Sequence, residues 1–434
     1  MDTLFFGAAR EVITPPIGGQ LYGYNPDIHS KEVADDLTAT AFYFAQGDVK
    51  ALMITATVCL IQTELAGEIL DLISTSTGGP RGAILLSATH THSGPNVAGS
   101  YGWGSIDRAY CDAIFIPKIL CVAQQAVKNA VPATMKTAQG DSQVGINRRQ
   151  LHPNNTIGLG QNPWAPYNPA MTVLSFADEK GKILGNLIHY GCHGTAAGGN
   201  TEITRDWSGH MTDALEAMNG GITAFFNGPE GDVGPRLSNG KTTGNLSYVK
   251  ELGAKAAADV LKIYSAGLTE TPVTLQTITI ETKVPLKPRI PQEDADAIRN
   301  KFKDFTVNLG GQIRYQMELI LETYEKGEAD LPSFDFDQTF IQLGNVVFVA
   351  FPFELFSEIG MRIDKFFPDL KVLSLSNTNG SAGYMVTQDA LCRGGYEVEM
   401  HQYGRTQEYR DDADFYLFQT AVDTIQKLTG KEDA

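Results

Sequence analysis

The sequence predicts an α/β fold in which a layered, mixed β-sheet core is flanked by helices. Short apolar runs rich in β-branched residues alternate along the 434 residues with longer segments whose apolar residues return every three or four positions. Such alternation favours a layered α/β architecture. Because no linker-like stretch separates the candidate catalytic residues, we expect the whole chain, 1–434, to form a single domain.

The individual elements follow from these patterns in chain order. The predicted strands are Leu37 to Phe44, Ala51 to Leu60, Gly82 to Ala88, Met171 to Phe176, Ile183 to Tyr190, Ile222 to Asn227, Phe340 to Phe351 and Val372 to Leu375. The predicted helices are Glu64 to Ser74, Ala109 to Ala130, Asp206 to Met218, Tyr248 to Ala266, Phe353 to Phe367 and Asp412 to Leu428. Residues 291–327 carry many charges of both signs, and we expect them to form a peripheral helical insertion with little that looks catalytic.

The composition narrows the possible partners and compartments. Lys and Arg total 34 against 50 for Asp and Glu, and a net charge of −16 disfavours nucleic acids and stable association with anionic membranes. We therefore expect a small-molecule substrate, while the patterns leave the oligomeric state open. No signal-peptide pattern opens the chain, and no stretch approaches the roughly 20 apolar residues of a membrane span. We expect a cytoplasmic protein, or a secreted or periplasmic one if a leader was removed.

The cysteines argue against two kinds of site. There are five of them, an odd number, and none forms a CxxC pair. This usage disfavours both a disulfide framework and a zinc site made of thiolates. A metal site in this chain would therefore be built from histidines and carboxylates.

The strongest local signal is the segment SATHTHSGP, in which an apolar strand runs into His90 and His92 and then a Gly-Pro turn. Strand ends are where α/β folds place their sites. On an extended backbone the two side chains point to the same face, so both imidazoles can approach one ion or one anion. Two hydrogen-bonded loop histidines are the alternative interpretation.

A second strand, in IHYGCHGT, ends with His189 and His193 around a glycine turn. The helical HExxH geometry does not apply, because Gly191 and Gly194 break a helix and no glutamate lies between the histidines. We expect one of the two histidines to be structural. Cys192 lies between them without a paired base, which indicates a buried thiol.

Two further strands deliver carboxylates. The first runs into the loop NGPEGDVGPR, where we interpret Glu230 as an ordinary surface-turn acid and regard Asp232 as a candidate for the site. The second, VVFVAFPFE, ends in Glu354 at the start of a predicted helix. Such a carboxylate could complete a metal site, or it could be a first-turn acid that the helix dipole favours.

In this order, the segments resemble the catalytic domain of the neutral, non-lysosomal ceramidases. The motif THTHSGP at residues 89–95 is the most specific element, and the opening GAAREVITPP, the DDL at residues 35–37 and NGPEGDVGPR support it. The resemblance implies a hydrolase with the ceramidase catalytic fold, ending where those enzymes continue into a C-terminal β-domain.

The resemblance also implies a zinc site and a set of substrate-facing residues. The implied ligands of Zn²⁺ are His90, His193, Glu354 and Tyr384, where His193 is preferred over His189 because CHGT is similar to the family's HPT turn. The implied catalytic residues are His92, Arg148, Asp232 and Tyr396, with Arg148 preferred over Arg149. His92, Arg148 and Tyr396 would stabilise the oxyanion or protonate the leaving group, and Asp232 would orient His193 or act as a base.

One departure from the family concerns Gly228, which stands where the ceramidases have a catalytic serine. Hydrolysis would then rely on water activated by zinc, and the space left by glycine would admit a compact polar substrate. We therefore expect an amide, ester or lactone substrate that is not ceramide. The alternatives are a genuine ceramidase or N-acyl amidase, a metallophosphoesterase, and a non-catalytic binding protein.

Overall fold

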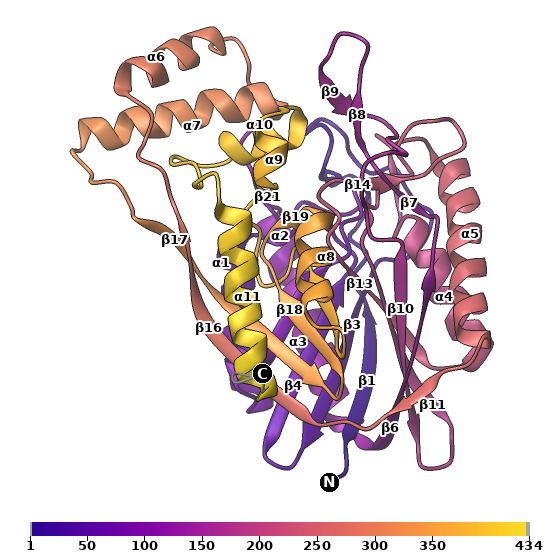
Figure 1. Ribbon diagram of the computed structural model, residues 1–434. Helices are drawn as coiled ribbons and strands as arrows, with labels where there is room; N and C mark the ends of the chain where they lie inside the picture. Colours follow the sequence, from indigo (N-terminus) through magenta and orange to yellow (C-terminus); the bar gives the residue numbers. More distant parts are fainter. Residues whose placement is uncertain (1, 431–434) are drawn as a thin grey trace.

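The protein is built on two β-sheets that pack face to face (Figure 1). It is described here by a computed structural model that covers residues 2–430. The larger sheet has nine strands in the order β13-β11-β10-β6-β1-β3-β4-β5, with β15 beside β6, and the smaller has four in the order β16-β17-β18-β20. Both sheets are mixed, since β4 and β5, β11 and β13, and β18 and β20 run parallel while their other neighbours are antiparallel. The mixed-sheet core that the sequence predicts is confirmed.

The strand boundaries are as follows. The larger sheet contains β1 (Phe5–Val12), β3 (Thr38–Gln46), β4 (Val49–Ala56), β5 (Ile84–Ala88), β6 (Val131–Asp141), β10 (Ala170–Asp178), β11 (Ile183–Tyr190), β13 (Ile222–Asn227) and β15 (Thr269–Thr271). The smaller sheet contains β16 (Leu275–Pro285), β17 (Ser333–Leu343), β18 (Val346–Ala350) and β20 (Lys371–Leu375). Short pairs join β2 (Glu32–Val33) to β12 (Glu202–Ile203), β7 (Gly145–Asn147) to β14 (Val233–Pro235), β8 (Arg149–Leu151) to β9 (Ile157–Leu159), and β19 (Glu354–Leu355) to β21 (Tyr384–Met385).

Helices cover the outer faces of both sheets. On the larger sheet, α1 (Thr63–Thr77) and α3 (Ile116–Lys128) pack on one half, and α4 (Trp207–Asn219) and α5 (Leu246–Ser265) pack on the other. On the smaller sheet lie α8 (Ser357–Phe366) and α11 (Ala413–Thr429). The result is four layers in the order helix, sheet, sheet, helix (Figure 1).

The alternation of side chains along β4 shows how the layers are held together. Leu52 and Ile54 pack against α1 and α3, whereas Ala51 and Met53 belong to the core between the two sheets. A strand with apolar residues on both faces is expected where both faces are covered. This is why the sequence of β4 reads as a nearly continuous apolar run.

The predicted insertion at residues 291–327 contains α6 (Gln292–Lys301) and α7 (Asn308–Glu325), which pack on each other at the upper left of Figure 1. Two short helices, α9 (Gln388–Leu391) and α10 (Tyr396–Gln402), follow β21. Gln312 of α7 accepts a hydrogen bond from the Trp103 indole at 3.0 Å. The insertion therefore touches the loops that carry the candidate site.

One helical stretch, Arg108–Lys128, is long and apolar enough by length and composition to cross a membrane. It consists of α2 (Arg108–Tyr110), a π-helical turn (Cys111–Phe115) and α3. The face of α3 that carries Ile119, Val122 and Ala126 is buried against the larger sheet. In this structure the stretch packs as a core helix.

Two predicted elements are wrong in their boundaries. The predicted strand Phe340 to Phe351 is a hairpin, because Gly344 adopts φ +62° and turns β17 into β18. The predicted helix Phe353 to Phe367 begins only at Ser357, because Glu354 and Leu355 pair with β21 instead. Strands β1, β6 and β16 were not expected, since their mixed apolar and polar composition hides them in a single sequence.

Candidate metal centre

The THTH segment follows β5 and carries two histidines whose side chains meet. His90 and His92 approach each other with 3.3 Å between their Nε2 atoms. The extended backbone that the sequence suggested is wrong, because His90 adopts a left-handed conformation with φ +67°. A non-glycine residue in this region is strained by about 1–3 kcal/mol and is typical of functional sites. Hydrogen bonds from the His90 backbone to Val58 and from Nδ1 to the Cys59 carbonyl, both 2.9 Å, hold it there.

His193 is brought to the same place by the loop after β11. Gly194 pairs with the THTH segment, since its N–H bonds the His90 carbonyl at 3.2 Å and its carbonyl accepts from the His92 N–H at 3.0 Å. His193 Nδ1 donates to the backbone carbonyls of Glu230 at 2.8 Å and Val233 at 3.1 Å. These bonds fix the ring and leave Nε2 as the atom that faces the site.

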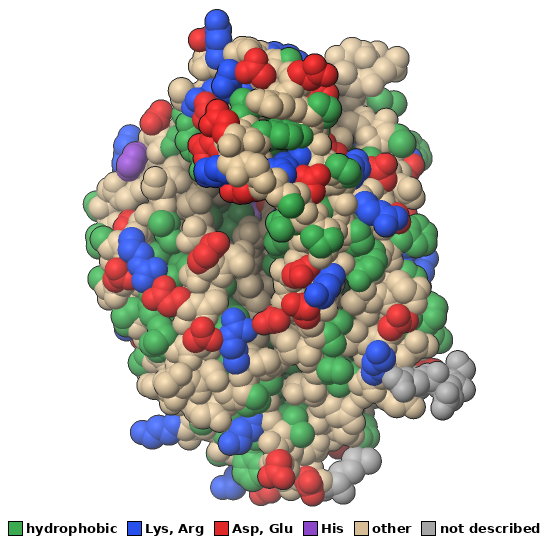
Figure 2. All heavy atoms as spheres, turned by 90° about the vertical axis from the view of Figure 1, so that its left-hand side faces the viewer, with side chains coloured by type: hydrophobic (Ala, Val, Ile, Leu, Met, Phe, Trp, Pro, Cys, Tyr) green, Lys and Arg blue, Asp and Glu red, His purple; other side chains and the backbone are tan. Residues whose placement is uncertain are grey.

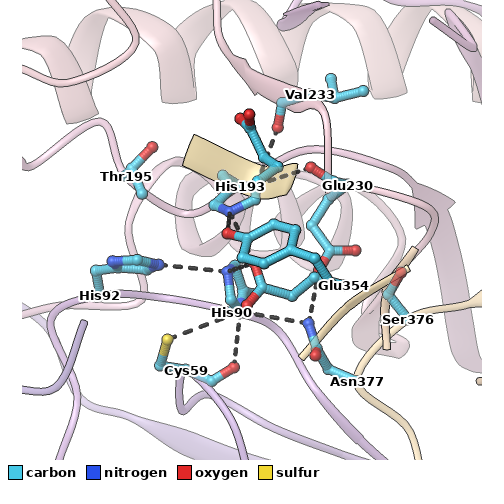
Figure 3. A network of polar contacts seen from close by, with 12 residues as sticks. Cys59, His90, His92, His193, Thr195, Glu230, Val233, Glu354, Ser376 and Asn377 are labelled. Atoms are coloured by element: carbon cyan, nitrogen blue, oxygen red, sulfur yellow. Dashed lines mark hydrogen bonds and ion pairs between the residues drawn. The ribbon is translucent and has the colours of Figure 1, made fainter. Parts of the chain in front are cut away.

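Glu354 and Tyr384 lie side by side, although they are far apart in the sequence. They are direct partners in the parallel pair β19 and β21. The backbone N–H of Glu354 also bonds the Gly383 carbonyl at 3.0 Å. This pairing prevents Glu354 from joining α8 and turns its carboxylate toward the histidines (Figure 3).

Three buried ligand atoms converge at this point (Figure 3). Glu354 Oε2 lies 3.2 Å from His193 Nε2 and 3.4 Å from His90 Nε2. The Tyr384 hydroxyl lies 3.5 Å from His193 Nε2. Both imidazoles already use Nδ1 to donate to carbonyls, and Glu354 Oε2 is buried without a hydrogen-bond partner. The cluster therefore presents lone pairs to one another, an arrangement that a positive charge among them would stabilise.

The charge states of the cluster agree with this requirement. Burial lowers the pKa of His193 to about 3, and Arg148 and His90 act in the same direction. Burial disfavours the carboxylate of Glu354, but the neighbouring His90 and His193 hold its pKa well below the ordinary value. Burial also disfavours a charged His90, yet Cys59 and Glu354 raise its pKa well above the ordinary value. Besides the charge of Arg148, a protonated His90 or a metal ion beside the buried carboxylate would offset the cost of its burial.

These donors fit a single zinc ion. Zinc takes imidazole nitrogen and carboxylate oxygen in a tetrahedral arrangement, and ligands about 2.0–2.1 Å from the ion then lie about 3.3 Å apart. The separations of 3.2 and 3.4 Å around Glu354 Oε2 match that spacing. Within residues 2–430, a second possible group, Cys59 with His90 and His92, shares His90 and so does not form a separate centre.

His189, the alternative ligand, points elsewhere. Its Nε2 lies 2.8 Å from the Ser374 carbonyl, and burial lowers its pKa to about 4. The expectation that Gly228 leaves space beside the metal is wrong, because a Cβ there would meet His189 Nε2 at 2.8 Å and the Gly191 nitrogen at 3.1 Å. The His189 ring fills the space into which a side chain at position 228 would point.

Of the two adjacent arginines, Arg148 is the one that reaches the cluster. Its Nη2 donates to the Tyr384 hydroxyl at 2.9 Å, and its Nε pairs with Glu397 at 2.8 Å. Arg149 pairs with the other oxygen of Glu397 at 2.7 Å and donates to the Gly394 carbonyl. Burial raises the pKa of Tyr384 well above its ordinary value, and the charge of Arg148 opposes that rise.

Asp232 and Glu230 have different positions from those expected. Asp232 does not orient His193: it accepts bonds from the Ser357 backbone at 2.7 Å, the Ser357 hydroxyl at 3.0 Å and Asn147 at 3.0 Å. It therefore ties the loop to the first turn of α8. Glu230 is not a surface acid, because its side chain is fully buried and accepts from Asn377 at 2.6 Å. Burial raises the pKa of Glu230 to about 8.

His92 and Tyr396 line a cavity of about 330 Å³ that opens beside the cluster. Figure 2 looks onto the side that carries α6 and α7 and shows the surface hollowed below them. A Cβ at Gly23 would lie 2.3 Å from His92 Nδ1, and Gly23 has φ +124°, so only glycine lets this loop approach the ring. His92 Nδ1 is buried without a partner, and burial lowers the pKa of His92 well below its ordinary value.

Sequence reasoning missed several residues that hold the site in place. Asp206 accepts backbone bonds from Ala197 at 2.9 Å and Trp207 at 2.7 Å, which anchors the loop after His193. The Trp207 indole donates to the His193 carbonyl at 2.9 Å. An aspartate at the first position of the predicted helix 206–218 was the available signal for Asp206 as a cap. Glu397 and Asn377 carried no such signal.

The fold and part of the sequence match neutral ceramidase. A neutral ceramidase of Pseudomonas aeruginosa is 24% identical in an alignment of 195 positions that covers 42% of this chain and 29% of that protein. The crystal structure of neutral ceramidase from Pseudomonas aeruginosa has a TM-score of 0.77 at 17% identity and covers 99% of this chain and 75% of that one. A ceramidase complexed with C2 gives 0.76 at 16% identity, covering 99% and 76%. No family model matches. The sequence match spans less than a third of the curated relative, and the chain has a ceramidase-like fold at low sequence identity.

Proposed function

We propose that this ceramidase-like chain is a zinc-dependent hydrolase that cleaves a small amide, ester or lactone. The observation that carries the proposal is the convergence of buried ligand atoms from His90, His193 and Glu354. The Nε2 atoms of the two histidines lie 3.2 and 3.4 Å from Glu354 Oε2. An unpaired buried carboxylate between two imidazole nitrogens is costly unless a cation joins them. The likeness to neutral ceramidase, a hydrolase by its name, supports the same class of reaction.

His90, His193 and Glu354 would hold the zinc ion, and the neighbouring Tyr384 hydroxyl would complete the set. When bound, zinc polarises a carbonyl group and makes water acidic enough to supply hydroxide near neutral pH. The hydrogen bonds from Nδ1 of both histidines to backbone carbonyls fix the rings and strengthen Nε2 as a donor. Arg148 contacts the Tyr384 hydroxyl and favours its ionised form.

Two side chains on the cavity wall are placed to act on the substrate. His92 stands next to His90, and Tyr396 packs against Tyr384 with 6.0 Å between ring centres. Both groups can donate a hydrogen bond to an oxyanion or to a leaving group. A donor of this kind is worth roughly 3 kcal/mol in the transition state.

The shape of the site favours a small substrate over ceramide. The cavity of about 330 Å³ is at the lower end of the range for small-molecule sites. His189 fills the space next to Gly228, so that loop offers neither a hydroxyl nor extra room. The chain's own residues thus leave water as the nucleophile.

The proposal is tested with a panel of short-chain esters, lactones, N-acyl compounds and ceramides. Zinc-loaded protein should hydrolyse at least one small substrate, and removal of zinc by a chelator should abolish the activity. Glu354→Gln should abolish it as well, whereas the matched variant Glu358→Gln, at a half-buried glutamate of α8, should not. Equal activity with and without the metal would refute the zinc mechanism, and ceramide turnover as fast as that of the best small substrate would refute the substrate class.

A further inference from the structure

Arg405 lies in the wall of the cavity and is held in an unusual way. Its guanidinium carbon is 4.2 Å from the ring centre of Phe334 and 4.2 Å from that of Tyr409. The two rings therefore fix the side chain by cation–π contacts on its faces. The hydrogen-bonding edge of a stacked guanidinium stays available, because its donors lie in the plane of the group.

Within residues 2–430, Arg405 has neither an ion-pair partner nor a side-chain hydrogen bond, and its Nη1 is buried without an acceptor. The hydroxyl of Tyr409 is also buried without a partner. The buried Arg148 and Arg149 pair with Glu397, and Arg205, which like Arg405 is partly buried, pairs with Asp35 and Asp213. Burial lowers the pKa of Arg405 to about 10, and no charged group among the described residues opposes this shift. A partly buried cation that contacts ring faces but has no anionic partner is costly unless a ligand supplies the negative charge.

The position of Arg405 connects it to the candidate metal centre. Its side chain lines the same cavity as His90, His92, Glu354 and Tyr396. Among the described residues that line the cavity, Glu64 is the one acid outside the metal cluster; it is exposed on α1 and lies beyond ion-pair distance from Arg405. A ligand whose reactive carbonyl lies at the metal cluster can therefore place a second group at Arg405.

We propose that Arg405 binds a carboxylate of the substrate, so that the enzyme hydrolyses small acyl compounds that carry a free acid group, such as N-acyl amino acids. This inference rests on the proposed hydrolase function and narrows its substrate class. A planar carboxylate matches the planar guanidinium fork. A single arginine balances one negative charge, whereas a phosphate dianion would need a second cation, and among residues 2–430 no Lys or other Arg lines this cavity.

The test is a binding experiment that does not depend on turnover. N-acetyl amino acids with neutral side chains of increasing size, and the primary amide of each, are titrated calorimetrically into the protein as purified and after chelator treatment. Wild type should bind the best acid more tightly than its amide, and Arg405→Met should bind that acid ~10- to 100-fold more weakly, as expected for a lost charge-assisted hydrogen bond. Binding of the amide should change little.

Matched variants and a phosphate-containing probe distinguish carboxylate binding at Arg405 from a loss of folding and from phosphate binding. Arg405→Lys should recover part of the preference for the acid, and Arg393→Met, which removes an exposed arginine paired with Asp389, should behave as wild type. Thermal midpoints identify any variant that fails to fold. Equal affinity of wild type and folded Arg405→Met for the acids, or tighter binding of N-acetyl-phosphoethanolamine than of any acid, would overturn the proposal. An intact acid preference in a protein without zinc or hydrolase activity would instead refute the proposed function alone.

Discussion

Replacing Gly228 by serine, the residue that the ceramidase resemblance would place there, should destabilise this protein. A Cβ at position 228 would lie 2.8 Å from His189 Nε2 and 3.0 Å from its Cε1, both inside van der Waals contact. The ring cannot retreat without losing its 2.8 Å contact to the Ser374 carbonyl. Overpacking of a buried site costs about 1–3 kcal/mol. We therefore expect Gly228→Ser to lower the free energy of unfolding by about that amount.

Urea unfolding of a double-mutant cycle with His189→Ala tests this reasoning. His189→Ala alone should cost about 2–4 kcal/mol, because it leaves a cavity and an unpaired carbonyl. In the double variant the serine would occupy part of that cavity, so the two losses should be less than additive by at least about 1 kcal/mol. Gly228→Ala is the matched control and should lose as much as the serine variant, since the clash comes from Cβ. Wild-type stability in Gly228→Ser, or full additivity, would refute the packing described.

Three further predictions follow from the same contacts. Asp232→Asn should lower the free energy of unfolding by about 1–3 kcal/mol in urea titrations. The variant should keep bound zinc, because the carboxylate of Asp232 holds Ser357 rather than His193, and loss of zinc would contradict this. Gly23→Ala should displace His92 and reduce kcat by about 100-fold with the metal retained; an unchanged kcat would show that the loop yields freely. Burial lowers the pKa of folded His189 to about 4 from 6.5, so only the unfolded state binds a proton between these values, and stability falls as pH drops from 6.5 to 4. Protonation of His189 accounts for about 3 kcal/mol of this loss of stability. Urea unfolding at the two pH values should show that His189→Gln lacks this part of the loss. An identical pH dependence in wild type and His189→Gln would contradict the prediction.

The fold class could be predicted because the buried elements have strong periodic patterns. Strands such as β5 and β13 are buried along their length, and α3 and α5 carry regular apolar faces. Strand β16 escaped prediction because only three of its 11 residues are buried, so no apolar run marks it in the sequence. The hairpin between β17 and β18 depends on Gly344, which has a positive φ. The turn was not predicted because Gly344 lies within an apolar run that is typical of a single strand.

The candidate site was predictable only as far as local motifs reach. The histidine motifs and the resemblance named His90, His193, Glu354 and Tyr384, and the structure places all four together. Glu354 and Tyr384 come together because β19 pairs with β21, and no local sequence pattern predicts this two-residue pairing. Burial of Glu230 is equally invisible, because an acid between glycines reads like a surface turn until its surroundings are known.

The central claim is that His90, His193 and Glu354 hold a zinc ion, and metal analysis of the purified protein tests it most directly. Mass spectrometry after gentle purification should find about one zinc per chain in wild type and in His189→Ala, and little in His193→Ala, because loss of one ligand opens the site. Circular dichroism would check that both variants are folded. Absence of any transition metal in wild type, or equal zinc loss in the two folded histidine variants, would contradict the account.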